Sequence, residues 1–255
     1  MSRMLLVWML IGAAVAIIGC TGPAKSETPT CSIEAFEGLS FTVCDLRSGS
    51  DPRPEFHLAW NGKDGRPLGS LKALRRDLGP DARRVMFAMN AGMYHPGQRP
   101  VGLLMRNGTV ITPLETRTGS GNFYDLPNGV FSVDREGRYR IEETGAFAAS
   151  GRRPVWATQS GPLLVRDGVI HPVAARGARA MVRNAVLDCG PNLARFVISN
   201  DPVTMEQLAR FGRDHLGCPI ALYLDGAVSA LWSPEMKRLD EQKGLGPLLY
   251  VMSGR

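Results

Sequence analysis

The chain has 255 residues, of which 44% are hydrophobic and 21% charged, a composition typical of a globular protein and too apolar for a disordered one. The formal net charge is +6, and the basic residues are scattered without interleaved aromatic residues, which argues against a nucleic-acid partner. Mild positive charge suits an anionic envelope substrate or a lipid surface. No period of 20 to 50 residues repeats along the chain, which argues against a solenoid or propeller.

Residues 1–19 read as a lipoprotein signal peptide. A short positive start precedes an uninterrupted apolar stretch over residues 4–18, which is too short for a comfortable bilayer span and typical of a signal peptide. The stretch leads into Gly19-Cys20, which resembles a bacterial lipobox and predicts cleavage before Cys20 and lipid attachment to it. Plain signal-peptidase cleavage nearby, with an incidental cysteine, is the alternative.

Residues 20–30 are small, polar and proline-containing, and predict a lipidated tether. We therefore expect a protein anchored by lipid in the bacterial cell envelope. Thr21 stands where many inner-membrane lipoproteins of enteric bacteria carry an aspartate, which favours the outer membrane, facing the periplasm.

Four cysteines remain, and an oxidising compartment would favour their pairing. Four cysteines permit three pairings. Proximity in sequence favours Cys31 with Cys44, across an N-terminal hairpin, and Cys189 with Cys218, between two late elements. A metal site is the alternative, but no CxxC or HxxxH spacing supports it, so we expect structural disulfides and no metal. The sequence also requires no cofactor.

Residues 31–255 predict one α+β domain that is strand-rich and mainly antiparallel, with two or three helices. A helix over 70–79 is followed by a strand that ends at Asn90, and a helix over 204–217 is followed by a strand that ends at Asp225. Two strands that each end on a polar residue close to a glycine suggest one shared ligand site. Glycine turns predict hairpins, and further short strands are expected at 39–45, 55–60, 101–106, 110–113, 130–134, 139–143, 163–165, 182–187 and 196–199.

The candidate site residues come from loops that combine polar groups with glycine. Asp225, at a strand end, is the carboxylate best placed for acid or base work. Ser160 and Gly161 could form a backbone nest for an anion, with Arg183 as a charged clamp. Asparagine side chains bind sugar hydroxyls as neutral donors and acceptors, which nominates Asn90 and Asn128. His95, in the first of these loops, could also contact a ligand.

Each of these residue types also has an ordinary structural role. An asparagine can form an Asx-turn, an arginine a surface ion pair, and an aspartate can start a turn. A Ser/His/Asp triad stays open as well, because its members meet only in the fold, although no GxSxG elbow is present. The sequence also lacks a P-loop and a GxGxxG motif.

Several motifs in order, over nearly all of residues 31–255, resemble the bacterial branch of the phosphodiester glycosidase family. The segments that carry the resemblance are FAMNAGMYH, PVGLLMRNG, GNFYDLPNGVFSVD, ATQSGPLLVRDGVIHP, RNAVLDCG and LGCPIALYLDGAVSALWSPE. The resemblance implies hydrolysis of a sugar-1-phosphodiester, which releases the sugar and leaves a phosphomonoester.

By position, the resemblance also implies site residues. Asn90 and Gly92 match the family's Asn-Gly strand exit, Arg183 and Asn184 match its Arg-Thr or Arg-Asn pair, and its Leu-Asp-Gly-Gly-x-Ser turn corresponds to Asp225, Gly226 and Ser229, with Ala227 in place of the second glycine. Two other functions stay open: a non-catalytic envelope lipoprotein that binds glycan or cell-wall phosphodiester, and a lipid-anchored serine hydrolase acting through Ser160, Ser199 or Ser229.

Overall fold

The structure is a computed structural model that describes residues 31–254. The predicted signal peptide, the tether and the lipidated Cys20 therefore lie outside the described residues. Within residues 31–254, no helix is long and apolar enough to cross a bilayer.

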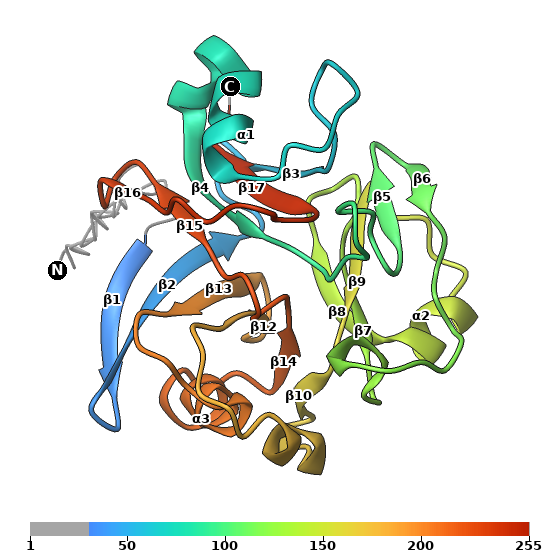
Figure 1. The fold of residues 1–255 in the computed structure, drawn as a ribbon, viewed down its shortest axis with the longest axis vertical. Helices are drawn as coiled ribbons and strands as arrows, with labels where there is room; N and C mark the ends of the chain where they lie inside the picture. The colour runs from blue at the N-terminus through green and yellow to red at the C-terminus, as the bar shows by residue number, and fades with distance from the viewer. Residues whose placement is uncertain (1–30, 255) are drawn as a thin grey trace, which may run out of the picture.

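The described residues form three β-sheets, and every pairing between their strands is antiparallel, which confirms the predicted strand-rich α+β class (Figure 1). The seven-stranded sheet has the order β1 (Cys31–Phe36), β2 (Leu39–Arg47), β13 (Leu193–Ser199), β12 (Asn184–Asp188), β14 (Ile220–Tyr223), β10 (Leu163–Arg166) and β11 (Val169–Ile170). A second sheet has the order β16 (Arg238–Leu239), β15 (Leu231–Ser233), β4 (Val85–Asn90), β17 (Leu248–Met252) and β3 (Glu55–Ala59). The third has the order β6 (Thr109–Thr112), β5 (Leu104–Arg106), β9 (Trp156–Ser160), β7 (Gly129–Val133) and β8 (Tyr139–Glu143).

Each sheet packs against one α-helix. Helix α1 (Leu71–Leu78) shares an apolar cluster with β4 and β17, α2 (Thr144–Ala149) with β5, β7 and β9, and α3 (Met205–Arg210) with the seven-stranded sheet. Helix α3 continues into a π-helical turn (Phe211–His215), and 3-10 turns occur at Gly79–Arg84, Asn122–Tyr124 and Pro172–Arg176.

Local signals at the two long helices match the predictions. The Ser70 hydroxyl accepts from the N–H of Ala73 and so starts α1. Thr204 and Gln207 form the predicted reciprocal capping box of α3. Both helices therefore begin where the sequence places them, and each is followed, after a 3-10 or π-helical turn, by a strand of the candidate site.

The three sheets meet around one central core. Phe56, Phe131 and Phe196 come from three different sheets, and their ring centroids lie 5.4 to 6.2 Å apart. Edge-on and offset rings at such distances add specific stabilisation to the burial of apolar surface. Through these aromatic contacts the three sheets pack against one another.

Both predicted disulfides are present. Cys31 and Cys44 are directly opposite each other in the β1–β2 hairpin, and Cys189 pairs with Cys218. Both bonds belong to the seven-stranded sheet or to the turns at its end.

Some predicted boundaries were wrong. The strand expected over 101–106 begins only at Leu104, because Gly102 packs so tightly that an added Cβ would lie 2.4 Å from Gln159 Oε1. Strand β9 was expected as a loop, and α2 and the strands after β14 were not predicted at all. Strand β9 has the sequence WATQS, which lacks the apolar alternation of a strand, although its last four residues are buried.

Candidate functional site

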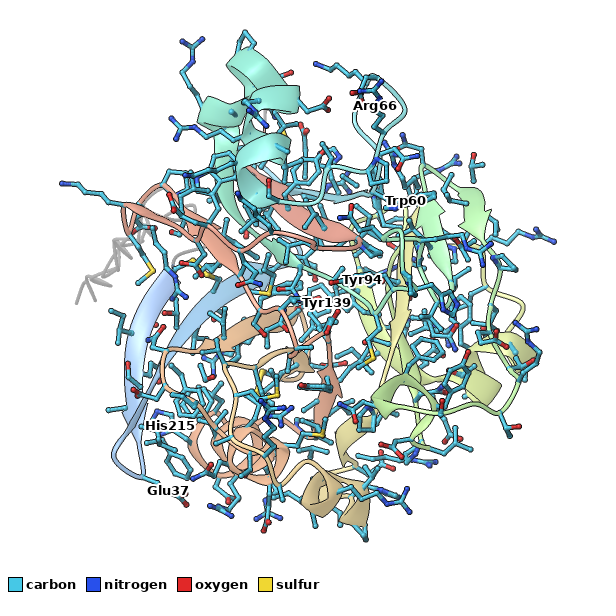
Figure 2. All side chains as sticks on the ribbon, in the orientation of Figure 1. Glu37, Trp60, Arg66, Tyr94, Tyr139 and His215 are labelled. Carbon is cyan, nitrogen blue, oxygen red and sulfur yellow. A yellow bond between two sulfur atoms is a disulfide. The ribbon has the colours of Figure 1, made fainter. Side chains whose placement is uncertain are left out.

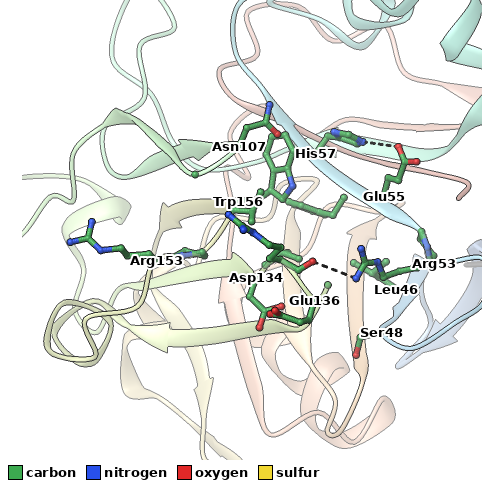
Figure 3. Close-up of a pocket in the computed structure, with 18 of the residues that line it drawn as sticks. Leu46, Ser48, Arg53, Glu55, His57, Asn107, Asp134, Glu136, Arg153 and Trp156 are labelled. Carbon is green, nitrogen blue, oxygen red and sulfur yellow. Dashed lines mark hydrogen bonds and ion pairs between the residues drawn. The ribbon is translucent and has the colours of Figure 1, made fainter. Parts of the chain in front are cut away.

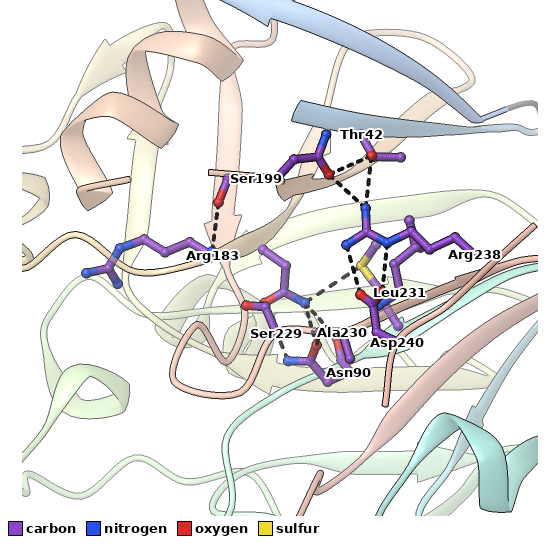
Figure 4. Close-up of polar contacts among 12 residues, drawn as sticks. Thr42, Asn90, Arg183, Ser199, Ser229, Ala230, Leu231, Arg238 and Asp240 are labelled. Atoms are coloured by element: carbon purple, nitrogen blue, oxygen red, sulfur yellow. Dashed lines mark hydrogen bonds and ion pairs between the residues drawn. The ribbon is translucent and has the colours of Figure 1, made fainter. Parts of the chain in front are cut away.

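Two predicted strand ends converge at the candidate site. Asn90, the last residue of β4, donates through Nδ2 to the carbonyl oxygen of Asp225 at 2.8 Å, although 135 residues separate them. The Oδ1 atom of Asn90 accepts from the N–H of Ala230 at 2.9 Å. One amide side chain from the second sheet therefore holds both ends of the 225–230 loop that leaves the seven-stranded sheet (Figure 4).

Asn184, the first residue of β12, completes this network. Its Nδ2 donates to the carbonyl oxygen and to Oδ1 of Asn90 at 3.0 and 3.1 Å, and its Oδ1 accepts from Ser229 Oγ at 3.3 Å. Asn90 is 1% exposed and Asn184 is 0% exposed. The structure therefore directs both amides into the protein, where they shape the loop instead of facing a ligand. We call these two side chains, with Ser229 and the backbone they bind, the asparagine network.

Asp225 begins the loop that the asparagine network holds. Its Oδ1 accepts from the N–H of Ala227 at 3.1 Å, whereas no described residue bonds to Oδ2. Burial raises the pKa of Asp225, and the Ala227 N–H opposes that shift. No ion pair within residues 31–254 neutralises this carboxylate, so burial without a cation adapts it to exchange protons.

Tyr94 lies near Asp225, close to the middle of the molecule (Figure 2). Burial raises the pKa of the Tyr94 phenol, and the nearby charge of Asp225 raises it further. The ring packs so closely on Gly246 that a Cβ there would lie 2.3 Å from Tyr94 Cδ1. A neutral phenol beside the carboxylate is a hydrogen-bond donor available to a substrate or to water.

Arg183 fixes the hydroxyl of Tyr223, which packs against the turn after Asp225. The guanidinium is 2% exposed; it donates through Nε to Val203 O at 2.8 Å, through Nη2 to Gly177 O and Arg179 O, and through Nη1 to Tyr223 Oη. Four of its five N–H donors are therefore committed within the protein. The expected phosphate clamp is instead a buried arginine that fixes a tyrosine.

The Tyr223 hydroxyl lies directly under Gly226. A Cβ built at Gly226 would fall 1.8 Å from Tyr223 Oη, so a glycine is required at this position. Burial raises the pKa of Tyr223 to about 12, although the charge of Arg183 opposes the shift. The phenol therefore stays neutral and packs against the turn that follows Asp225.

A cavity of about 580 Å³ opens beside this turn. Its walls include Gly226, Ala227 and Ser229, together with Arg238 and Lys243. Arg238 is held in place because it forms two bonds to Asp240 at 2.8 and 2.9 Å and one to Asn200 Oδ1 at 2.7 Å (Figure 4). A volume of this size is in the range of small-molecule sites.

Two further predicted residues, Gly92 and Ser160, lie at strand β9 of the third sheet. A Cβ at Gly92 would lie 2.3 Å from Gln159 O, so this glycine lets the exit of β4 rest on β9. Ser160, at the end of β9, is fully buried, and its Oγ has no hydrogen-bond partner. The next residues are tied to the site, because Pro162 O accepts from the N–H of Tyr223 at 3.0 Å.

Two predicted residues have other surroundings. Asn128 donates to Phe123 O at 3.0 Å and packs against Gly161, where a Cβ would lie 2.6 Å from Asn128 Cβ. His95 lies in a tight turn with Arg99 and lines a separate cavity of about 330 Å³. Neither residue contacts the asparagine network through a hydrogen bond.

Sequence reasoning missed Tyr223 and gave Tyr94 no role. Tyr223 reads as one more residue of the apolar run IALYL, and only the register of β14 against β12 shows that its hydroxyl reaches Arg183. Tyr94 had a usable signal, since it stands two residues after Gly92 in a strand exit. Within residues 31–254, no group of three or more histidine, cysteine, aspartate or glutamate side chains is arranged to hold a metal ion.

Comparison with known proteins shows consistent similarity. The sequence profile described as phosphodiester glycosidase matches residues 83–243. The Escherichia coli K12 protein YigE, which is uncharacterized, is 34% identical over 176 residues, covering 68% of this chain and 67% of its own.

Solved structures share the fold. The catalytic domain of zebrafish N-acetylglucosamine-1-phosphodiester alpha-N-acetylglucosaminidase, auto-inhibited by its pro-peptide, superposes with a TM-score of 0.59 at 13% identity, over 89% of this chain and 83% of that one. A hypothetical protein from Synechocystis superposes with a TM-score of 0.55 at 14% identity, over 88% and 61% of the two chains.

Proposed function

This chain belongs to the phosphodiester glycosidase family, and we propose that it hydrolyses a sugar-1-phosphodiester in the bacterial cell envelope. The observation that carries the proposal is the position of Asp225. Its carboxylate is buried, forms no ion pair within residues 31–254 and has one oxygen without a described partner, and the next residue, Gly226, lines a cavity of suitable size. Asn90 and Asn184 hold the loop that carries it, and Tyr94 lies nearby with its phenol available as a donor.

The reaction breaks the bond between the anomeric carbon and the phosphate oxygen. Asp225 takes the proton of an attacking water, or attacks the anomeric carbon itself and forms an ester that water then hydrolyses. The sugar gains the hydroxyl, and the leaving group departs as a phosphomonoester. A phosphate group is a good leaving group, so the protonated acid partner of ordinary glycosidases is dispensable. Tyr94 is the donor placed to orient the water or the sugar.

The phosphate needs a partner other than Arg183, whose donors are largely committed. Lys243 lines the same cavity and forms no ion pair within the described part of the chain, unlike Arg238. We therefore propose that the phosphate binds at Lys243 and that the sugar lies against the turn over residues 226–229, which follows Asp225. The role of Arg183 is then to position Tyr223 and the turn above it.

The test is hydrolysis by the purified full chain in detergent. UDP-N-acetylglucosamine and a panel of sugar-1-phosphodiesters are incubated with wild type, with Asp225→Asn, and with Asp167→Asn as a matched exposed control. We expect wild type and the control to release free sugar, and Asp225→Asn to be slower by about 10²- to 10⁴-fold. Undiminished turnover by a folded Asp225→Asn variant would remove Asp225 from the mechanism.

Silence across the panel, with saturable binding of glycans, would favour the non-catalytic alternative. The serine hydrolase alternative has little support in the geometry, because within residues 31–254 Ser160 Oγ has no partner and no histidine bonds to Ser199 or Ser229. Fluorophosphonate labelling of the full chain distinguishes it, since only an activated serine reacts.

The location is a separate proposal that rests on residues 1–30. We propose that Cys20 carries lipid and that the domain over 31–255 faces the periplasm, anchored in the outer membrane. Cell fractionation tests this directly. Cys20→Ser should move the protein from the membrane fraction to the soluble one, and an unchanged distribution would contradict lipid anchoring.

A further inference from the structure

A groove of about 810 Å³ contains none of the predicted site residues. It lies at the opposite end of the strands: Trp156, the first residue of β9, lines it, whereas Ser160, the last, belongs to the candidate site. At about 3.3 Å per residue, the two ends of β9 are roughly 13 Å apart. The groove collects segments from all three sheets and is therefore a separate feature of the fold (Figure 3).

The groove has an uncompensated positive charge. Its three acidic residues are each paired with an arginine outside it: Asp134 and Glu136 bind Arg138 at 2.7 and 3.1 Å, and Glu55 binds Arg84 at 2.8 Å. Three of its own arginines, by contrast, form no ion pair within residues 31–254; these are Arg53, Arg135 and Arg153. The lining therefore offers guanidinium donors to an anion from outside.

Two of these arginines lie on segments that contact each other. The Arg53 side chain lies across the turn of the β7–β8 hairpin, where it donates to Arg135 O at 3.4 Å and contacts Gly137. Both side chains are exposed on segments that contact each other, so their guanidinium groups are available to one phosphate, which arginine binds with parallel N–H donors. Arg153 extends from the far rim of the groove (Figure 3).

The floor of the groove has a fixed aromatic face. Trp156 is half-buried, and His57 packs edge-on against it with ring centroids 5.1 Å apart. His57 in turn stacks on Tyr250 at 4.8 Å, which locks the set. Burial lowers the pKa of His57, which favours the neutral imidazole and leaves the positive charge to the arginines. Asn107 lies beside the indole and can supply an amide for hydroxyl groups (Figure 3).

We propose that this groove is a second ligand site that binds a phosphorylated saccharide, with the sugar ring against Trp156 and the phosphate at Arg53 and Arg135. The apolar C–H face of a sugar ring suits a flat indole, and the exposed amide of Asn107 suits its hydroxyls. The site does not depend on the proposed hydrolysis, because it shares no residue with the cavity lined by Gly226 and Lys243.

The test uses glucose 6-phosphate, a phosphomonoester that the proposed hydrolysis would not consume. Saturation-transfer NMR with the full chain in detergent measures its binding, beside glucose and inorganic phosphate. The first groove variant combines Arg53→Gln with Arg135→Gln, both at exposed positions, and the second is Trp156→Leu. Melting temperatures confirm that both variants fold. Arg152→Gln is the matched control, since Arg152 adjoins Arg153 but pairs with Glu142 and does not line the groove.

We expect saturable binding that both groove variants weaken about tenfold or more, and that Arg152→Gln and Asp225→Asn leave unchanged. Glucose and inorganic phosphate should each bind at least about tenfold more weakly than the combined ligand. The absence of saturable binding, equal binding by the groove variants, or loss in Asp225→Asn alone would overturn the proposal. Phosphate that binds as tightly as glucose 6-phosphate would overturn the saccharide part.

Discussion

The two ends of strand β9 differ in almost every respect. At the Ser160 end, most of the polar groups are buried and engaged with one another, and Ser160 Oγ and one Asp225 oxygen are left without a described partner. At the Trp156 end, a larger groove presents exposed arginines that are held by few contacts. The comparison teaches that volume is a poor guide to chemistry here, since a catalytic group needs a fixed position, whereas a binding groove needs access.

The largest expected effect on stability comes from the loss of the two disulfides. Neither disulfide includes a residue of the asparagine network, and the two enclose sequence separations of 13 and 29 residues. Their loss should lower the free energy of unfolding by about 3 and about 3.5 kcal/mol in the chain-entropy model. Urea unfolding with and without reductant measures the sum. Activity of the molecules that stay folded should persist, and its loss without unfolding would show that the disulfides also shape the site.

Removal of Asn184 tests how much the network contributes to stability. Asn184→Ala removes the donor to Asn90 O and leaves the Ser229 hydroxyl only its 3.4 Å hydrogen bond to Asp225 O, at about 1–3 kcal/mol for a buried group left unpaired. Arg135→Gln in the groove should change stability by no more than about 0.5 kcal/mol. Chemical denaturation of both variants provides the contrast. Equal losses would mean that the two ends are not different in rigidity.

A side chain at Gly226 tests the contact beneath the turn. Gly226→Ala places a Cβ 1.8 Å from Tyr223 Oη and should destabilise by about 1–3 kcal/mol while displacing Asp225. Combination with Tyr223→Phe removes the nearest atom and should restore part of the loss. Gly145→Ala in α2 is the control, because a Cβ there meets nothing within 4 Å and should stabilise by about 0.4–1 kcal/mol. A Gly226→Ala variant as stable and active as wild type would refute the contact.

The smallest expected effect concerns pH. Burial raises the pKa of Asp225 in the folded state, so its contribution to stability is fully present below the unfolded pKa and is lost as pH rises through the folded pKa. Asp225→Asn should therefore melt at a higher temperature than wild type at pH 7, and the difference should vanish below about pH 4. Thermal melts across this range decide the matter, with Asp167→Asn as the control. A difference that is the same at both pH values would exclude the carboxyl as its source.

The features predicted correctly from the sequence are those set by local chemistry. Ser70 and Thr204 cap their helices, glycine turns form the β5–β6 and β7–β8 hairpins, and neighbouring cysteines pair. The expected convergence of the strand ends at Asn90 and Asp225 is confirmed by their 2.8 Å hydrogen bond. Local patterns are enough here because the same helix–strand design occurs twice.

The direction in which the side chains point could not be predicted. Gln159 shows why: its Oε1 accepts from the N–H groups of Leu103 and Glu115, and its Nε2 donates to Glu115 O and Thr144. These partners are up to 56 residues away, so nothing near residue 159 marks a polar sequence as a buried strand. The amides of the asparagine network face inward for the same reason, because only the packing of two sheets determines where they lie.

The 135 residues between Asn90 and Asp225 also have a consequence for how the protein is made. The first helix–strand unit is synthesised long before its partner exists, and its asparagine has nothing to bind until nearly the whole domain has emerged. Closing so long a loop comes late, after local helices and hairpins have formed. A nascent or truncated chain that stops short of residue 225 therefore lacks both the Asn90–Asp225 contact and the loop that follows it.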